Sequence, residues 1–196
     1  MISRMAGFGV NVLLRVSIAA FLADVLRHPD DPRYAGKAIP WRNLVIVGGF
    51  SMLFPLRFAR DWAGHGRERR QAYPVWVDNL YLSIFWLDMA GNALNLYDRY
   101  THFDLIPHFH GTGALTTVLQ HVFDWRPLGA FGAANGIHGL LEAQEYGTDV
   151  FCGTHNVRGW WDSAGDLIAG LLGSAIYGGV SAARRSRRST RRERLG

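Results

Sequence analysis

The sequence predicts an all-α protein, a polytopic membrane bundle of about six transmembrane helices, and two observations carry this prediction. The mean hydropathy over 196 residues is −0.01, but this average hides apolar blocks of membrane length that alternate with short polar blocks. Basic residues gather in the connection after the second apolar block and in the C-terminal tail. This segregation is typical of a protein that crosses a membrane several times.

Six apolar segments are expected to form the helices. Their approximate ranges are 5–26, 41–58, 75–96, 107–123, 127–146 and 160–182. The first is expected to stay in the protein, because Arg15 interrupts its apolar run and no small-residue cleavage pattern precedes His28. Arg15 is expected to pair with a carboxylate or to extend toward the membrane interface. The fourth segment is the shortest, so a five-span or re-entrant variant stays open.

Charge placement predicts the orientation. The tail "RRSRRSTRRERLG" holds seven arginines against one glutamate, and the second connection "RFARDWAGHGRERR" holds five arginines. Beside apolar spans, such runs indicate the cytoplasmic face and contact with anionic lipid. Nothing in the sequence matches a nucleic-acid-binding fold, so no specific nucleic-acid partner is expected. With six spans, both termini lie in the cytoplasm. One transmembrane domain is expected over 1–182, followed by a disordered basic tail over 183–196.

Small residues are expected where helices pack closely in lipid. The glycines singled out for this role are Gly170 and Gly173 in the last segment and Gly129, Gly132 and Gly136 in the fifth. The single cysteine, Cys152, excludes an intrachain disulfide and a metal site built from several cysteines.

Polar side chains follow one stripe on several expected helices. The third helix carries Asp88, Asn92 and Asn95 at i, i+4 and i+7. The fifth carries Asn135, His138, Glu142 and Glu145 within about 80° of arc. The sixth begins with Asp162 and Asp166, and the fourth is preceded or opened by Asp104, His108 and His110. Under the six-span topology, these four helices direct their polar groups into one cavity in the outer half of the membrane.

The acidic groups of this cavity need a partner, because a carboxylate at mid-bilayer costs about 2.5–3.5 kcal/mol on insertion scales. Histidine and carboxylate ligands together suit Zn²⁺, Mn²⁺ or iron, so a divalent metal of one of these kinds is the expected cofactor. The candidate metal ligands are Asp88, Asp104, His108, His110, His138, Glu142, Glu145, Asp162 and Asp166. Glu142 and Asp166 are also the candidate catalytic residues. The alternatives are mutual hydrogen bonding between protonated carboxyl groups and ion pairs with Arg99 or Arg158.

Individual residues have simpler interpretations as well. Asp104 can cap the fourth helix, and Asp162 can be a carboxylate favoured by the helix dipole. His108 and His110 lie about 200° apart on a regular helix, so they share one ion only if His108 precedes the helix. The fifth helix reads His-x-x-x-Glu-x-x-Glu, which matches neither HExxH nor the Glu-x-x-His of ferritin-like bundles.

Three stretches, "LDMAGNALNLYDRYTHFDLIPHFHG", "GIHGLLEAQEYG" and "WWDSAGDLIAGLLGS", in this order resemble the YjdF-like group of small bacterial inner-membrane proteins. The resemblance covers about residues 88–173. It implies a bacterial cytoplasmic-membrane protein, and its family positions fall on Asp104, His108, Glu142, Asp162 and Asp166. The resemblance implies no settled biochemical role.

Three functions remain open at this point. The first is a metal-dependent membrane hydrolase or transferase acting on a lipid or lipid-linked substrate. The second is a non-catalytic subunit that packs onto other membrane subunits. The third is a transporter or proton relay, which is disfavoured because the polar cluster occupies one half of the bilayer and the sequence shows no internal repeat. Membrane lipids are expected contacts in every case.

Overall fold

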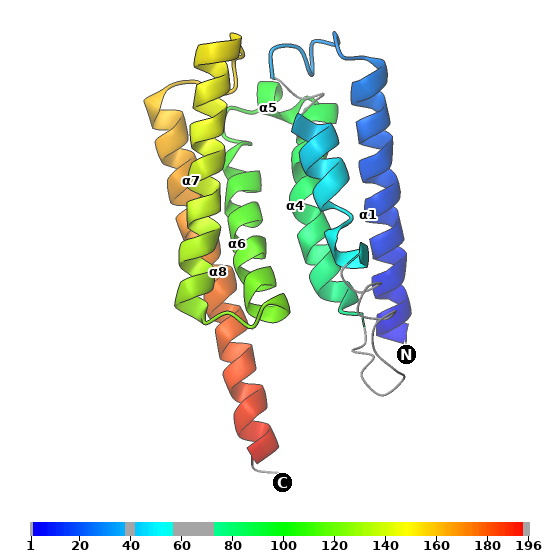
Figure 1. The fold of residues 1–196 in the computed structure, drawn as a ribbon, viewed down its shortest axis with the longest axis vertical. Coiled ribbons are helices and arrows are strands. Elements are labelled where there is room, and N and C mark those ends of the chain that lie inside the picture. The colour runs from blue at the N-terminus through cyan, green and yellow to red at the C-terminus, as the bar shows by residue number, and fades with distance from the viewer. Residues whose placement is uncertain (1, 38–41, 57–72, 194–196) are drawn as a thin grey trace. The chain divides into compact units, whose positions relative to one another are not determined.

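The structure is a computed structural model that describes residues 2–37, 42–56 and 73–193. All elements in these ranges are helices (Figure 1), which confirms the all-α class. The chain divides into two compact units, Met1–Asn95 and Leu96–Gly196. The single transmembrane domain expected over 1–182 stays a prediction. The arginine-rich second connection lies outside the described residues.

The first unit consists of α1 (Ile2–Arg27), η1 (Asn43–Gly49) and α4 (Val75–Ala93). Helix α1 packs against both α4 and η1. The core of this unit is apolar and is formed by Ile18, Val25, Tyr34, Val47, Leu82 and Met89. The helices expected over 5–26 and 75–96 therefore correspond to α1 and α4.

The second expected span has a different local structure. Its central part, Asn43–Gly49, is a π-helix, and residues 51–52 form a turn before another short helical stretch. Glycine is a poor helix former, and this segment contains Gly48 and Gly49 in succession. The continuous α-helix expected over 41–58 is therefore interrupted within the described residues.

A buried ion pair joins α1 to α4. Arg15 donates from NH2 to Oδ2 of Asp78 at 2.7 Å, and the carboxylate is fully buried. Asn11 and Tyr73 also donate to this oxygen, at 2.6 and 2.5 Å. Arg15 therefore pairs with a carboxylate, which confirms the first of the two expectations for this residue. The sequence analysis did not identify Asp78 as the partner.

The second unit consists of α5 (Leu96–Arg99), α6 (Leu105–Val122), α7 (Pro127–Cys152) and α8 (Trp160–Glu193). The three long helices all contact one another. Pro127 begins α7, where its missing N–H leaves no helical hydrogen bond unmade. Gly153, at a φ of 67°, ends α7 in the left-handed region. Helix α8 continues to Glu193, through residues that were expected to form a separate disordered tail.

Glycine permits α6 and α8 to approach closely. A Cβ atom on Gly173 would collide with the backbone carbonyl of Phe109, and one on Gly113 would lie 2.8 Å from the carbonyl oxygen of Gly173. The packing role expected for the α8 glycines is thus confirmed. A Cβ on Gly129, Gly132 or Gly136 of α7 would meet no described atom within 4 Å, so these glycines mediate no close contact among the described residues and their packing role stays a prediction.

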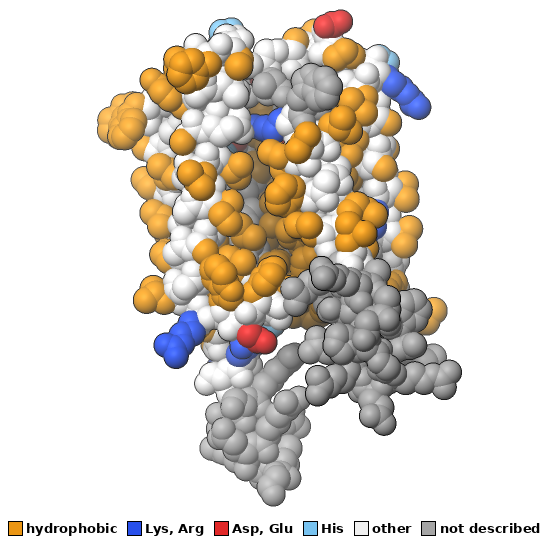
Figure 2. Space-filling model, viewed as in Figure 1, with side chains coloured by type: hydrophobic (Ala, Val, Ile, Leu, Met, Phe, Trp, Pro, Cys, Tyr) orange, Lys and Arg blue, Asp and Glu red, His pale blue; other side chains and the backbone are white. Residues whose placement is uncertain are grey.

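Two helical segments, Met5–Arg27 and Trp160–Arg187, are long and apolar enough to cross a membrane. Many large apolar side chains on the helices are exposed, and Figure 2 shows hydrophobic side chains distributed along the visible helices. Polar side chains, by contrast, occupy much of the interior, including Asp78, His138, Glu142 and Asp166. This combination of length, apolar exterior and polar interior suggests that the protein associates with a membrane.

Candidate metal site

Five ionisable side chains from the second unit gather between its helices. Asp104 immediately precedes α6, and His108 lies one turn later. His138 and Glu142 lie one turn apart on the buried face of α7, and Asp166 lies in the second turn of α8. The i, i+4 spacing places each sequential pair on one helix face. The packing of α6, α7 and α8 then brings the three faces together.

The first trio consists of His108, His138 and Glu142. Nδ1 of His108 lies 2.7 Å from Nε2 of His138, and each of these nitrogens lies 3.4 Å from Oε1 of Glu142. His138 and Glu142 are buried, and His108 is partly buried. Two imidazole nitrogens and a carboxylate oxygen converging in this way can hold a metal ion.

The second trio uses the other nitrogen of His108. Its Nε2 lies 3.2 Å from Oδ1 of Asp104 and 3.9 Å from Oδ1 of Asp166. These three atoms also lie close enough together to hold a metal ion. His108 is therefore common to both trios, with one ring nitrogen facing each.

Three atoms of this cluster are buried without a hydrogen-bond partner among the described residues. They are Nδ1 of His138, Oε1 of Glu142 and Oδ1 of Asp166. A buried polar atom that lacks a partner costs about 1–3 kcal/mol, and more when the group is charged. The two carboxylate oxygens face nitrogens of the trios, so a cation placed among these atoms would satisfy them.

A glycine on α8 makes room for His138. A Cβ on Gly170 would collide with Nδ1 and Cε1 of the His138 ring and would lie 3.0 Å from Oγ1 of Thr112. The ring therefore lies directly against the backbone of α8. This contact fixes the plane of the imidazole that contributes Nε2 to the first trio.

Asp104 occupies the N-cap position of α6 but makes no side-chain cap hydrogen bond. Its carboxylate instead faces His108, one turn along the helix. The interpretation of Asp104 as a simple helix cap is therefore wrong. His110 belongs to the same regular helix and turns away from the trios, since its Nδ1 lies 3.0 Å from the hydroxyl of Tyr177. The expected 200° separation of the two histidines explains this difference.

The remaining predicted ligands do not join either trio. Asp162 accepts a hydrogen bond at 3.0 Å from the backbone N–H of Arg158, as a carboxylate at the start of a helix does. Glu145 is partly buried on α7 and belongs to neither group of candidate ligands. Asp88 lies in the first unit, where its Oδ2 is 3.9 Å from Arg42. Its expected approach to the cluster stays a prediction.

Asp149 was not among the residues predicted from the sequence, yet it organises the connection from α7 to α8. Its carboxylate accepts hydrogen bonds from the backbone N–H groups of Asn156 and Val157 and from the side chains of Thr154 and Asn156. Burial raises the pKa of Asp149, but these hydrogen bonds outweigh burial and hold the pKa below its ordinary value of 3.8. The sequence feature that could have identified this turn is the cluster of Gly, Thr and Asn residues that follows Asp149.

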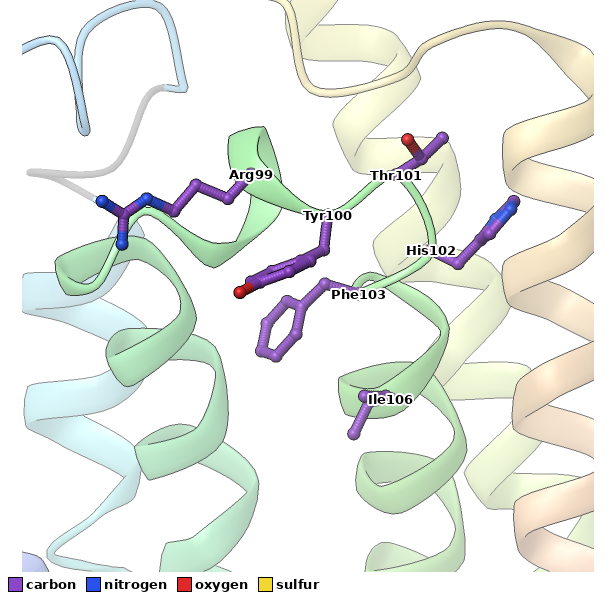
Figure 3. A pocket seen from close by; sticks show the side chains of 6 residues that line it. All are labelled: Arg99, Tyr100, Thr101, His102, Phe103 and Ile106. Carbon is purple, nitrogen blue, oxygen red and sulfur yellow. The ribbon is translucent and has the colours of Figure 1, made fainter.

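The same connection is tied to the segment that precedes α6. Arg158 donates to the carbonyl oxygens of Tyr97 and Thr101, at 2.5 and 3.2 Å. Residues 99–103 and Ile106 line an open pocket of about 710 Å³. In Figure 3, the side chains of Tyr100, Phe103 and Ile106 point to the same side of this segment, and His102 points to the other. The pocket therefore lies along the segment that carries Asp104.

Comparisons with protein families, curated proteins and solved structures found no match to this chain. The YjdF-like resemblance therefore stays a prediction.

Proposed function

We propose that this protein is a divalent-metal-dependent membrane enzyme, a hydrolase or transferase that acts on a lipid or lipid-linked substrate. The observation that carries the proposal is the convergence of His108 Nδ1, His138 Nε2 and Glu142 Oε1, with the glutamate oxygen buried and without a hydrogen-bond partner among the described residues. Imidazole nitrogens combined with a carboxylate favour Zn²⁺, Mn²⁺ or iron over Ca²⁺ and Mg²⁺.

The chemistry follows from this donor set. A divalent cation, when bound, polarises an ester or phosphoryl oxygen and lowers the pKa of a water molecule. The chain itself must then accept a proton, and Glu142 and Asp166 are the buried carboxylates of the cluster that can do so. Three protein ligands leave room for substrate and water, which is typical of catalytic rather than structural zinc sites.

The lipid substrate is proposed from the surroundings of the cluster. The apolar exterior of the helices suits a bilayer, and the pocket along residues 99–106 is lined by Tyr100, Phe103 and Ile106 together with Arg99. Aromatic and aliphatic side chains can contact acyl chains, and a guanidinium can contact a phosphate. Phe103 and Ile106 are close to Asp104 in sequence, which is the ground for proposing that a lipid bound in the pocket presents its head group to the cluster.

The membrane arrangement belongs to the same proposal. We propose six spans in a bacterial cytoplasmic membrane, with both termini in the cytoplasm. This topology explains why the tail is rich in arginine and why the polar cluster lies in one half of the bilayer. Under this topology the cluster opens to the outer leaflet.

The proposal is tested with purified full-length protein in detergent micelles that contain mixed ester and phosphate lipids. We expect release of a fatty acid, a phosphate or a head group that chelator abolishes and Zn²⁺ or Mn²⁺ restores. Glu142→Gln should reduce this activity by at least about 100-fold, because it removes a ligand and a proton acceptor. His155→Gln is the matched control, since His155 is exposed and outside both trios. Equal activity in Glu142→Gln and wild type would reject the proposal that this cluster catalyses the reaction.

A second candidate function is a non-catalytic subunit of a larger membrane complex, and one observation favours it. Gly129, Gly132 and Gly136 form a small-residue stripe on α7, at which an added Cβ would meet no described atom within 4 Å. Such stripes permit close approach of another helix in lipid. Under this alternative, Gly132→Leu should abolish co-purification of partner subunits and leave metal content unchanged.

A further inference from the structure

One imidazole is shared by the two trios of the candidate metal site. Nδ1 of His108 faces His138 and Glu142, and Nε2 faces Asp104 and Asp166. The lone pairs of the two nitrogens point away from opposite sides of the ring, so they cannot be directed at the same ion. A single cation in the first trio therefore leaves the second trio to be explained.

The second trio contains a buried oxygen that hydrogen bonding does not satisfy. Asp166 is only 4% exposed, and its Oδ1 has no hydrogen-bond partner among the described residues. The distance of 3.9 Å to Nε2 of His108 is too long for a hydrogen bond. Asp104 lies nearer, at 3.2 Å, so one N–H on Nε2 would serve Asp104 and leave Asp166 unpaired.

We propose that Asp104, His108 and Asp166 form a second divalent-cation position, with His108 bridging two ions. The inference extends the proposed function, which requires only the first position. Each cation forms one coordinate bond to a ring nitrogen of His108. The single N–H proton of the neutral His108 imidazole leaves to solvent, and no electron is transferred. The four positive charges of two cations then balance three carboxylates, Asp104, Glu142 and Asp166, and one imidazolate.

The two positions differ in chemistry. The first offers two nitrogens and one oxygen, whereas the second offers one nitrogen and two oxygens. Oxygen-rich sites favour harder cations such as Mn²⁺, and nitrogen-rich sites favour Zn²⁺. With Asp166 acting as a ligand, the second carboxylate oxygen of Glu142 is the remaining proton acceptor. Paired cations are a recurring arrangement for phosphoryl and ester transfer.

The test is metal stoichiometry. Full-length protein in detergent is stripped with chelator, incubated with excess Zn²⁺ or Mn²⁺, desalted and analysed for metal per chain. We expect two ions per chain in wild type and one in Asp166→Asn, because Asn keeps the shape of Asp and loses its charge. Asp162→Asn is the matched control, one turn earlier on α8 and outside both trios, and it should retain two ions.

One ion per chain in wild type would overturn the second position whatever the variants show, and it would leave the proposed function intact. Two ions in Asp166→Asn would also overturn it. No metal in wild type would instead reject the first position as well. The wild-type measurement needs no variant, so misfolding of a variant cannot obscure the result.

Discussion

Gly170 of α8 faces the imidazole of His138 on α7 so closely that no side chain fits between them. A methyl group at this position would collide with Nδ1 and Cε1 of the ring. The backbone of one helix thus fixes a candidate ligand of another. Metal sites require such support, because affinity depends on ligand orientation as well as on ligand identity.

Gly170→Ala is therefore expected to displace the His138 ring and to weaken metal binding by about 10–100-fold, a range typical when ligand orientation is lost. Overpacking of the interface should also lower the unfolding free energy by about 1–3 kcal/mol. Thermal unfolding and metal titration measure the two effects. Gly179→Ala on the same helix is the control, since its Cβ would meet no described atom within 4 Å. Identical metal affinity in both variants would show that this contact does not position His138.

The ion pair between Arg15 and Asp78 gives a second prediction. Arg15→Leu leaves a fully buried carboxylate without its cation, so we expect this variant, measured beside Asp78→Leu, to lose about 3–5 kcal/mol in unfolding free energy. The double variant Arg15→Leu with Asp78→Leu removes both charges and should recover most of the loss. Denaturation in detergent measures both variants. A double variant as unstable as the sum of its singles would show that the two side chains do not interact.

Asp149 gives a prediction about pH. Its pKa is lower in the folded protein than its ordinary value of 3.8, so the contribution of its hydrogen bonds is complete above that value. This contribution disappears as the pH falls through the lowered pKa, because the protonated carboxyl accepts these hydrogen bonds less well. Amide hydrogen exchange of Asn156 and Val157 should therefore stay slow down to about pH 4, once corrected for its intrinsic pH dependence. Protection should then be lost progressively as the pH falls further, through the lowered pKa.

Asp149→Ala should expose the same two amides at neutral pH and should lower stability by about 1–2 kcal/mol. Asp124→Asn is the control, because Asp124 is exposed in another connection, pairs with Arg185, and has a φ of 52° that Asn tolerates. Unchanged exchange in Asp149→Ala would show that the carboxylate does not order the connection.

The sequence predicted those parts of the site that depend on helical periodicity. The i, i+4 pairs of Asp104 with His108 and of His138 with Glu142 lie on shared helix faces, and the divergence of His110 follows from the same geometry. These relations depend only on residue spacing within one helix. The helices themselves were predicted from the apolar blocks of the sequence. Five of the six expected segments correspond to α1, α4, α6, α7 and α8.

Relations between helices were harder to predict. The partner of Arg15 is 63 positions away, and the expectation that Arg15 pairs with a carboxylate did not indicate which acidic residue of the chain it would be. The division of the ligands into two trios depends on which nitrogen of His108 faces each helix, and spacing carries no information about this. The interruption at η1 falls at Gly48 and Gly49, whose poor helix propensity was given less weight in the prediction than the apolar pattern of the segment.

Binding of a divalent cation by the cluster around His108 can be measured through the metal-dependent thermal stability of the wild-type protein. A ligand at 100 times its Kd stabilises the folded state by about 2.7 kcal/mol. We therefore expect chelator-stripped protein to retain at least one Zn²⁺, Mn²⁺ or iron ion per chain after reloading, with a higher Tm, and His138→Gln to lose both effects while His155→Gln keeps them. Wild-type protein that retains no metal after reloading and shows no change in Tm would show that the cluster around His108 is not a metal site.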